Sequence, residues 1–517
     1  MTVIRQQSDK GPPAQRLNLP VFAGSAAVIT LLSLPIVLYP AASEKWLAQA
    51  QQWMADVFGW YYMLLMVVCM LFVFWLALSR FGALKLGQQQ DEPEFSYLSW
   101  VAMLFSAGIG IALVYYGAYE PLDHFLQPPE GSGGTVQAAR NAMALTFLHW
   151  GLHGWALYAL IATALAWFAY RGGRPLALRS ALYGLCGDRV NGWPGHLVDG
   201  FGILVTVISM VTNLGIGALL VSSGLNYLFQ LEQSPAMING LLVAMMVVAT
   251  LAAVSGVEKG IAMLSRINVV LLCLLLLFVF IAGPTLHLLN GLLQNTGDYL
   301  SALVSKSFDV YLYGQARHWQ GMWTLFYWAW WVSWAPFVGL FIARISRGRT
   351  VRQLIFGVML IPLGFTLAWL SLFGNTAIAL VLEQGNALLG KVALSDPPMA
   401  VYQLLESLPW TRVTAGFTVV ISFFLFLTPV DSGTLMIANL SSRGGAASED
   451  APAWLRVFWA VVTTLVCCAL LSAGSFNAMQ TAVVLCGLPF SLVILLYIVS
   501  LYRDLLRTEA ALLTPPR

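Results

Sequence analysis

The sequence predicts an all-α membrane protein with twelve transmembrane helices. Of its 517 residues, 59% are apolar and 9% are charged, whereas soluble domains carry roughly 25% charged residues. The apolar residues form long stretches without Asp, Glu, Lys or Arg, and a helix needs about 20 such residues to cross a bilayer. A soluble enzyme is therefore excluded, and the chain is expected to form one unit embedded in the lipid bilayer.

Each charge-free stretch predicts one span, except the last, which predicts two. The tenth stretch, 413–430, continues as apolar sequence past one acid, Asp431, to about Leu440. The last stretch, 457–502, is too long for one crossing and is interrupted at 472–477, so it gives the eleventh and twelfth spans. The first ten are residues 17–43, 57–79, 95–119, 141–170, 200–231, 233–257, 267–297, 318–343, 353–382 and 413–430.

The distribution of basic residues predicts the orientation. A cytoplasmic N-terminus places 20 of the 26 Lys and Arg in inner segments and 6 in outer ones, as expected because Lys and Arg set membrane topology. Both termini are thus predicted to be cytoplasmic, with short tails at 1–16 and 503–517 and no accessory soluble domain. Segment 289–317 has amphipathic spacing and is predicted to be a connecting helix on the periplasmic face.

Several functional classes are disfavoured by composition. The net charge of +3 comes without a long basic tract, so no nucleic-acid partner is expected. The six cysteines follow no metal-ligand or disulfide spacing, so no metal or cofactor is expected beyond a possible coupling ion. His149 and His153 imitate a metal pair, but no acid accompanies them within their span, and we interpret them as hydrogen-bonded core residues. An enzyme is therefore not predicted.

The third span contains a candidate helix break. Its centre reads Phe105-Ser-Ala-Gly-Ile-Gly-Ile-Ala112, with Gly108 and Gly110 in the middle of the membrane. Small residues there allow another helix to pack closely. Alternatively the helix unwinds and its freed carbonyls coordinate a cation, as in secondary transporters. The pattern alone leaves both interpretations open.

Two spans are unusually rich in aromatic residues. Such rings attract a quaternary ammonium group, which cannot donate hydrogen bonds. No acid lies in either span, so a cage of rings alone is predicted, although an aromatic stripe is also typical of a plain core. Gly151 and Gly154 are expected to leave space between the rings. The aromatic residues are Trp150, Trp155 and Tyr158 in the fourth span, and Trp328, Trp330, Trp331 and Trp334 before Pro336 in the eighth.

The run from Phe326 to Thr350 resembles the signature of the betaine/choline/carnitine transporter family. Shorter matches extend the resemblance over essentially the whole chain: Phe105–Ile111, Tyr116–Leu122, His149–Tyr158, Val257–Gly260 and Asp431–Gly433. The resemblance implies a LeuT-like fold and a homotrimer. Two leading helices at 17–94 would precede two inverted five-helix repeats, 95–288 (spans 3–7) and 318–502 (spans 8–12), which begin with breaks at Gly108–Gly110 and Ser333–Pro336.

The resemblance also implies roles for individual residues. Trp150, Trp155, Tyr158 and Trp331 would enclose a trimethylammonium group, and Trp328, Trp330 and Trp334 would shape the path or a second station. The backbone of Ser106 and Ile109 and the hydroxyl of Thr428 would hold the coupling cation. Three positions depart from the family pattern: Pro429 replaces a serine ligand, Ala262 replaces the arginine of an ion-free exchanger, and Ala112 matches neither the choline nor the betaine carriers.

We therefore expect a secondary transporter that imports a small quaternary ammonium solute of the glycine betaine, choline or carnitine class across the inner membrane. Transport would proceed by alternating access, coupled to sodium or protons. An exchanger of related substrates is the alternative, and a channel or membrane sensor is disfavoured because no continuous polar pore is evident. Asp431, the one acid placed inside a span, is interpreted as a structural acid ahead of a proton carrier. The short C-terminal tail favours constitutive uptake over tension-gated uptake.

Overall fold

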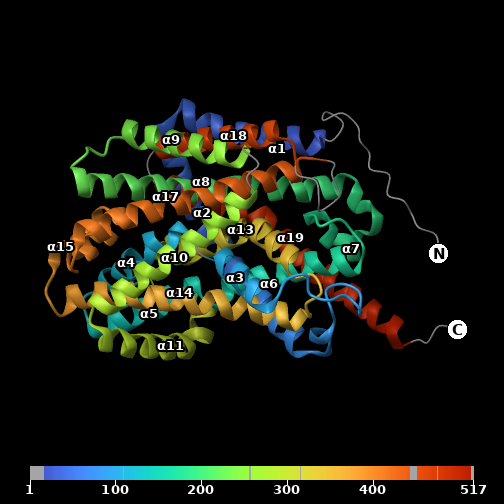
Figure 1. The fold of residues 1–517 in the computed structure, drawn as a ribbon, viewed down its shortest axis with the longest axis horizontal. Coiled ribbons are helices and arrows are strands. Elements are labelled where there is room, and N and C mark those ends of the chain that lie inside the picture. The colour runs from blue at the N-terminus through green and yellow to red at the C-terminus, as the bar shows by residue number, and fades with distance from the viewer. Residues whose placement is uncertain are drawn as a thin grey trace.

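The computed structural model describes residues 17–108, 110–254, 258–314, 316–442, 451–473 and 476–513, and it is almost entirely helical. Many of the long helices run along the longest axis of the molecule (Figure 1). Within these ranges, strand-like pairing is limited to two isolated bridges, Leu17 with Ser442 and Lys85 with Thr350. The predicted all-α fold class is confirmed.

The described residues up to Ala282 form ten α-helices. Prolines in the first turn begin α1, α2 and α8, where the missing N–H has no partner to lose. The Thr135 hydroxyl caps the first turn of α5. The helices are α1 (Leu19–Leu38), α2 (Pro40–Leu78), α3 (Tyr97–Gly108), α4 (Ile111–Leu126), α5 (Val136–Trp150), α6 (Leu152–Ala166), α7 (Tyr183–Cys186), α8 (Trp193–Phe229), α9 (Pro235–Val254) and α10 (Glu258–Ala282).

The described residues from Thr285 onward form nine more α-helices. A reciprocal capping box between Thr350 and Gln353 begins α14. The helices are α11 (Thr285–Ser307), α12 (Arg317–Met322), α13 (Thr324–Ile345), α14 (Val351–Leu382), α15 (Ala387–Ser395), α16 (Ala400–Glu406), α17 (Thr411–Leu440), α18 (Ala453–Ser472) and α19 (Phe476–Leu513). The predicted interruption of 457–502 is confirmed, since α18 ends at Ser472 and α19 begins at Phe476.

Among the described residues, ten helical stretches are long and apolar enough to cross a membrane, or eleven when a bent pair is counted. The predicted third span is divided into α3 and α4, of 12 and 16 residues. The total of twelve crossings therefore stays a prediction. The second leading helix begins at Pro40, not at 57, because its first turns are polar and a count of charge-free residues cannot detect them.

The predicted seventh span, 267–297, is wrong at its end. Helix α10 stops at Ala282, and the chain turns by 113° into α11. Pro284 lies at this turn; it has no N–H and disfavours a helical residue before it. Because α11 is amphipathic and carries no charge before Asp298, the charge-free stretch ran on into it. The connecting helix thus occupies Thr285–Ser307 instead of 289–317.

The predicted break at Ser333–Pro336 is also wrong. Helix α13 continues through Pro336 to Ile345. Proline removes one backbone hydrogen bond, but α13 packs along α6 and α19, and these contacts hold it helical. The eighth span instead consists of two helices that meet at Trp323, the single residue between the end of α12 and the start of α13, with φ −112° and ψ −78°.

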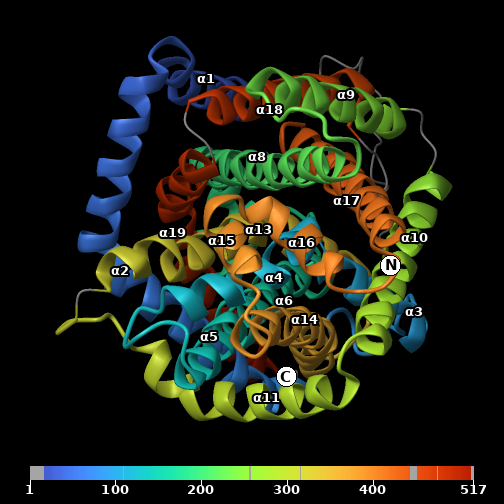
Figure 2. The ribbon, with the colours of Figure 1, turned by 90° about the vertical axis from the view of Figure 1, so that its left-hand side faces the viewer.

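The aromatic helices occupy the centre of the fold. In their most apolar windows, the aromatic segments 136–171 and 317–345 are 94% and 78% buried, whereas α1 is 22% buried and α9 is 28% buried. Figure 2 shows α1, α9 and α18 along one edge and α11 along the opposite edge, with α4, α6 and α13 between them. The poorly buried outer helices are the ones whose apolar side chains are left for lipid.

Segments that the sequence places on the cytoplasmic side meet at one end of the molecule. Leu17 pairs with Ser442, and Arg80, just after α2, forms an ion pair at 2.6 Å with Glu509 near the end of α19. The start of α1 and the end of α19 accordingly lie at the same end (Figure 1). That this end faces the cytoplasm stays a prediction.

Candidate functional site

An aromatic cluster is centred on Trp331 of α13. Its ring centroid lies 4.8 Å from that of Tyr158, 5.4 Å from Trp155 and 6.5 Å from Trp150. Its indole N–H donates a hydrogen bond to the carbonyl of His149 at 2.8 Å. All four aromatic side chains are buried. The structure therefore brings together the four residues that the sequence assigned to the cage.

The other three tryptophans of α13 have different neighbours. Trp330 joins the cluster through Trp150, with ring centroids 6.2 Å apart. The indole of Trp328 donates to the sulfur of Met63 at 3.0 Å, away from the cage rings. Trp334 is half-buried, and its recorded ring contact is with Phe337 at 5.4 Å. Residues three apart on a helix are about 4.5 Å apart along its axis, so a shared face does not bring all of them to one site.

The fourth span is interrupted at a single residue, Gly151, between α5 and α6. This break is not evident from the sequence. The prediction that Gly151 and Gly154 leave open space between the rings is wrong. A Cβ on Gly151 would lie 2.4 Å from the hydroxyl of Tyr299, and one on Gly154 would lie 2.2 Å from the ring of Trp331. The space beside each glycine is filled by a large side chain from another helix.

A carboxylate that was not predicted from the sequence lies beside the cage. Glu120 of α4 is fully buried. Its Oε2 accepts hydrogen bonds from the indole N–H of Trp150 at 2.8 Å and from the hydroxyl of Tyr327 at 2.5 Å. Its Oε1 accepts one from Nδ1 of His149 at 2.7 Å. The prediction of rings without a carboxylate is therefore wrong.

The error has a local cause. The predicted third span ended at residue 119 because charged residues were taken to bound each span, yet α4 continues through Glu120 to Leu126. Asp199 likewise lies inside α8, although the predicted span began after it, at residue 200. Asp431 is therefore not the one acid within a long helix. The available signal was the return of apolar residues after Glu120, at Pro121 and Leu122.

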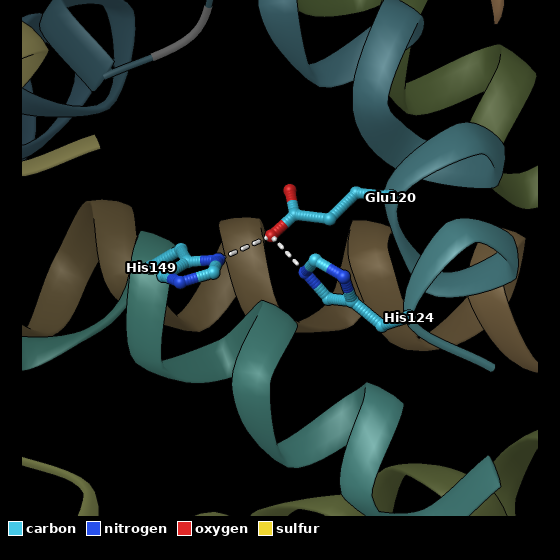
Figure 3. A group of neighbouring side chains, drawn as sticks. All are labelled: Glu120, His124 and His149. Atoms are coloured by element: carbon cyan, nitrogen blue, oxygen red, sulfur yellow. Dashed lines mark hydrogen bonds and ion pairs between the residues drawn. The ribbon is translucent and has the colours of Figure 1, made fainter. Parts of the chain in front are cut away.

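Figure 3 shows how Glu120 faces two imidazoles. Its Oε1 lies 2.7 Å from His149 and 3.4 Å from Nε2 of His124, one turn further along α4. The three groups offer ligand atoms within 4.8 Å of one another, a spacing that could hold a metal ion. The Nε2 of His149 lies 3.0 Å from the hydroxyl of Thr324. Both nitrogens of His149 thus have polar partners, and this confirms its interpretation as a hydrogen-bonded core residue.

The predicted cation site is described only in part. Ile109 and the side chain of Ser106 lie outside the described residues. Of the two interpretations left open for this segment, the structure has the interrupted helix, since α3 ends at Gly108 and Gly110 is extended at φ −135° and ψ 170°. Ala112 is not part of the break, because it lies in the first turn of α4.

On the other side of the predicted cation site, the hydroxyl of Thr428 donates to the carbonyl of Phe424 at 3.2 Å. It also accepts a hydrogen bond from Nδ2 of Asn268 at 2.8 Å. Asn268 comes from α10 and was not singled out in the sequence. Thr428 therefore bonds back to its own helix while keeping an oxygen directed toward α10.

A cavity of about 720 Å³ lies beside the cluster, next to the end of α15 and the residues Asp396–Pro398 that follow it. Tyr119 connects it to the cluster, because its ring lies 5.4 Å from Trp323 and 5.9 Å from Tyr116, which itself lies 6.0 Å from Trp150. Burial raises the pKa of the Asp396 carboxyl at its rim. Its lining includes Tyr115, Tyr119, Trp323, Asp396, Phe476 and Gln480.

Comparison with known proteins identifies relatives over nearly the whole chain. The chain is 59% identical over 503 residues to the osmo-independent choline transporter BetT1 of Acinetobacter baylyi, covering 97% of this chain and 96% of the relative. It is 43% identical to the osmo-dependent choline transporter BetT2 of the same organism, covering 95% of this chain and 72% of the relative. It is 40% identical to the glycine betaine transporter OpuD of Bacillus subtilis, covering 91% of each.

A solved structure of MhsT in complex with L-phenylalanine is a weaker match. Its TM-score is 0.45 at 14% identity, over 78% of this chain and 89% of that one, a likeness too low to establish how the helices are arranged. The decisive match is to the betaine/carnitine/choline transporter family, over residues 20–510. The protein is therefore a multi-pass membrane transporter, not an enzyme, and it belongs to the betaine/carnitine/choline transporter family.

Proposed function

We propose that the protein imports a small quaternary ammonium solute of the choline, glycine betaine or carnitine class by alternating access. The observation that carries the proposal is the convergence of Trp331 with Trp150, Trp155 and Tyr158 in the buried centre of the fold. A ring face attracts a cation by about 0.5–2 kcal/mol, most strongly where water is excluded. The relative with 59% identity is named a choline transporter, which favours choline within the class.

We further propose that uptake is coupled to sodium or protons, that both termini face the cytoplasm and that the protein is a homotrimer. Residues 95–288 and 318–502 would form the two inverted repeats, with 17–94 as the leading helices. The break at Gly108–Gly110, in the first span of the first repeat, supports this assignment, because discontinuous helices mark the binding sites of secondary transporters. Trp328, Trp330 and Trp334 would line the path on either side of the cage.

The test is uptake of labelled choline, glycine betaine and carnitine into proteoliposomes under imposed sodium or proton gradients. Accumulation of at least one of the three above its equilibrium level supports the proposal. If substrate only equilibrates, and does so solely when a related substrate is present inside, the protein is an exchanger. If none of the three is transported or bound by correctly folded protein, the proposed substrate class is wrong.

The sodium requirement should depend on position 429. Pro429 lacks the hydroxyl that a serine would add next to Thr428, so a sodium site there has one oxygen ligand fewer. Hard cations prefer several oxygen ligands. We expect Pro429→Ser to lower the sodium concentration for half-maximal uptake and Thr428→Ala to raise it, each by several-fold. The measurement is uptake against sodium concentration at fixed pH.

Thr418→Ala is the matched control for this experiment. Thr418 also lies in α17 and also donates to its own helix, at 2.8 Å to the carbonyl of Thr414, but it lies almost three turns away from Thr428. Its loss should leave the sodium dependence unchanged. Uptake that is indifferent to sodium in all variants, yet is driven by a proton gradient, would show that protons are the coupling ion.

A further inference from the structure

The connecting helix α11 contacts the interrupted fourth span on both sides of the break. Before the break, Asp298 accepts two hydrogen bonds from Arg140 of α5, at 2.6 and 3.0 Å. After the break, the hydroxyl of Ser307 lies 3.0 Å from Nε2 of His153 of α6. Figure 2 shows α11 running along the edge of the molecule next to α5. This surface helix is thus attached to the span that carries three of the four cage rings.

The third contact is made at the break itself. A helix leaves its first backbone N–H groups without intrahelical partners, and α6 begins at Leu152 inside the protein. The N–H of Leu152 donates to the hydroxyl of Tyr299 at 2.9 Å. Tyr299 is 2% exposed, and its hydroxyl occupies the space where a Cβ of Gly151 would lie. A side chain of α11 therefore fills the break and satisfies the first donor of α6.

The break separates two parts of the cage. Trp150 is the last residue of α5, whereas Trp155 and Tyr158 lie in the first two turns of α6. The direction in which α6 leaves Gly151 fixes the separation between these rings. A group that holds the first turn of α6 therefore also holds the geometry of the cage.

We propose that Tyr299 is a positioning residue for the substrate cage, and that its hydroxyl acts by holding the N–H of Leu152 at the break. The proposal rests on the proposed function, since it concerns the same cage. It assigns to the connecting helix a role in substrate affinity. Among the described residues, the ring of Tyr299 packs against none of the cage rings. Its aromatic neighbour is Phe147, with ring centroids 6.1 Å apart.

Tyr299→Phe tests the proposal, because it keeps the ring and removes the acceptor. Leaving the buried N–H of Leu152 without an acceptor should shift the equilibrium between the held and the displaced first turn of α6 by about tenfold. We expect the dissociation constant for choline, measured by tryptophan fluorescence in detergent, to rise by about that factor. The half-saturation concentration for uptake should rise in parallel, while the maximal rate stays within about twofold.

Tyr402→Phe is the matched control. The hydroxyl of Tyr402 is equally buried and donates to the carbonyl of Leu220 at 2.9 Å, far along the chain from the cage. If both variants lower the unfolding temperature but leave choline affinity unchanged, Tyr299 has a structural role only and the proposal is overturned. If wild-type protein binds no quaternary ammonium compound at all, the proposed function fails instead. The two failures are thus distinguishable.

A double-mutant cycle with Leu152→Pro tests the hydrogen bond directly. Proline has no N–H and is well tolerated at the first position of a helix, and Gly151 has the non-helical backbone, φ −92° and ψ −147°, that a residue before proline needs. In the Leu152→Pro background, Tyr299→Phe should change the dissociation constant less than twofold. An equal change in both backgrounds would overturn the proposed route through the N–H. Should the proline variant fail to fold, the comparison of Tyr299→Phe with Tyr402→Phe still decides the proposal.

Discussion

Glu120→Gln is expected to lower uptake by tenfold or more and to destabilise the fold. The carboxylate of Glu120 accepts hydrogen bonds from His149, Trp150 and Tyr327 in a fully buried position. A glutamine has one acceptor oxygen and presents an NH₂ group where the second oxygen stood, so at least one buried donor loses its acceptor. Each such loss costs about 1–3 kcal/mol, and Trp150, one of the cage residues, would no longer be held in place.

Tyr327→Phe is the internal comparison. It removes one donor and leaves no donor unsatisfied, while Glu120 keeps its bonds to His149 and Trp150. We expect Tyr327→Phe to reduce uptake several-fold less than Glu120→Gln does, and to lower the unfolding temperature by less. The measurements are initial uptake rate and thermal unfolding of the purified variants. Wild-type uptake and stability for Glu120→Gln would show that this carboxylate has no part in holding the cage.

Trp331→Leu is expected to weaken substrate affinity by several-fold to about thirtyfold while protein is still produced. Trp331 is the ring that contacts the other three cage residues. Leucine loses a cation–π contribution of about 0.5–2 kcal/mol and also the hydrogen bond to the carbonyl of His149. The affinity of Trp331→Phe should lie between those of the wild type and Trp331→Leu, because phenylalanine keeps a ring and loses the hydrogen bond.

Trp459→Phe provides the matched control in another helix, α18. Trp459 is as deeply buried as Trp331, but its indole donates to the hydroxyl of Ser441 at 3.0 Å and its ring packs against Phe22 and Phe458, away from the cage. The half-saturation concentration for choline should stay near the wild-type value in Trp459→Phe and rise in Trp331→Leu. An unchanged value in Trp331→Leu would remove Trp331 from the cage.

The sequence alone determined the fold class and the four aromatic residues of the cluster centred on Trp331, and it identified Gly108–Gly110 as a candidate break. Each of these follows from local properties. A membrane helix must be long and apolar enough by itself, because the bilayer offers no partners for its backbone. The two glycines have the backbone freedom that a break needs, but the same pattern also suits close helix packing, and the structure decided between the two. The four cage residues came from a family signature that is read directly from the chain.

The tertiary structure alone decided which polar groups sit inside the membrane region and where the other helices break. Glu120 is tolerated within α4 because donors from α5 and α13 surround it. Gly151 interrupts the fourth span where Tyr299 of α11 can take the freed N–H, while α13 continues through Pro336 because its neighbours hold it. The free energy of a buried polar group or a broken hydrogen bond depends on partners that are far away in sequence. No pattern within a single span contains that information.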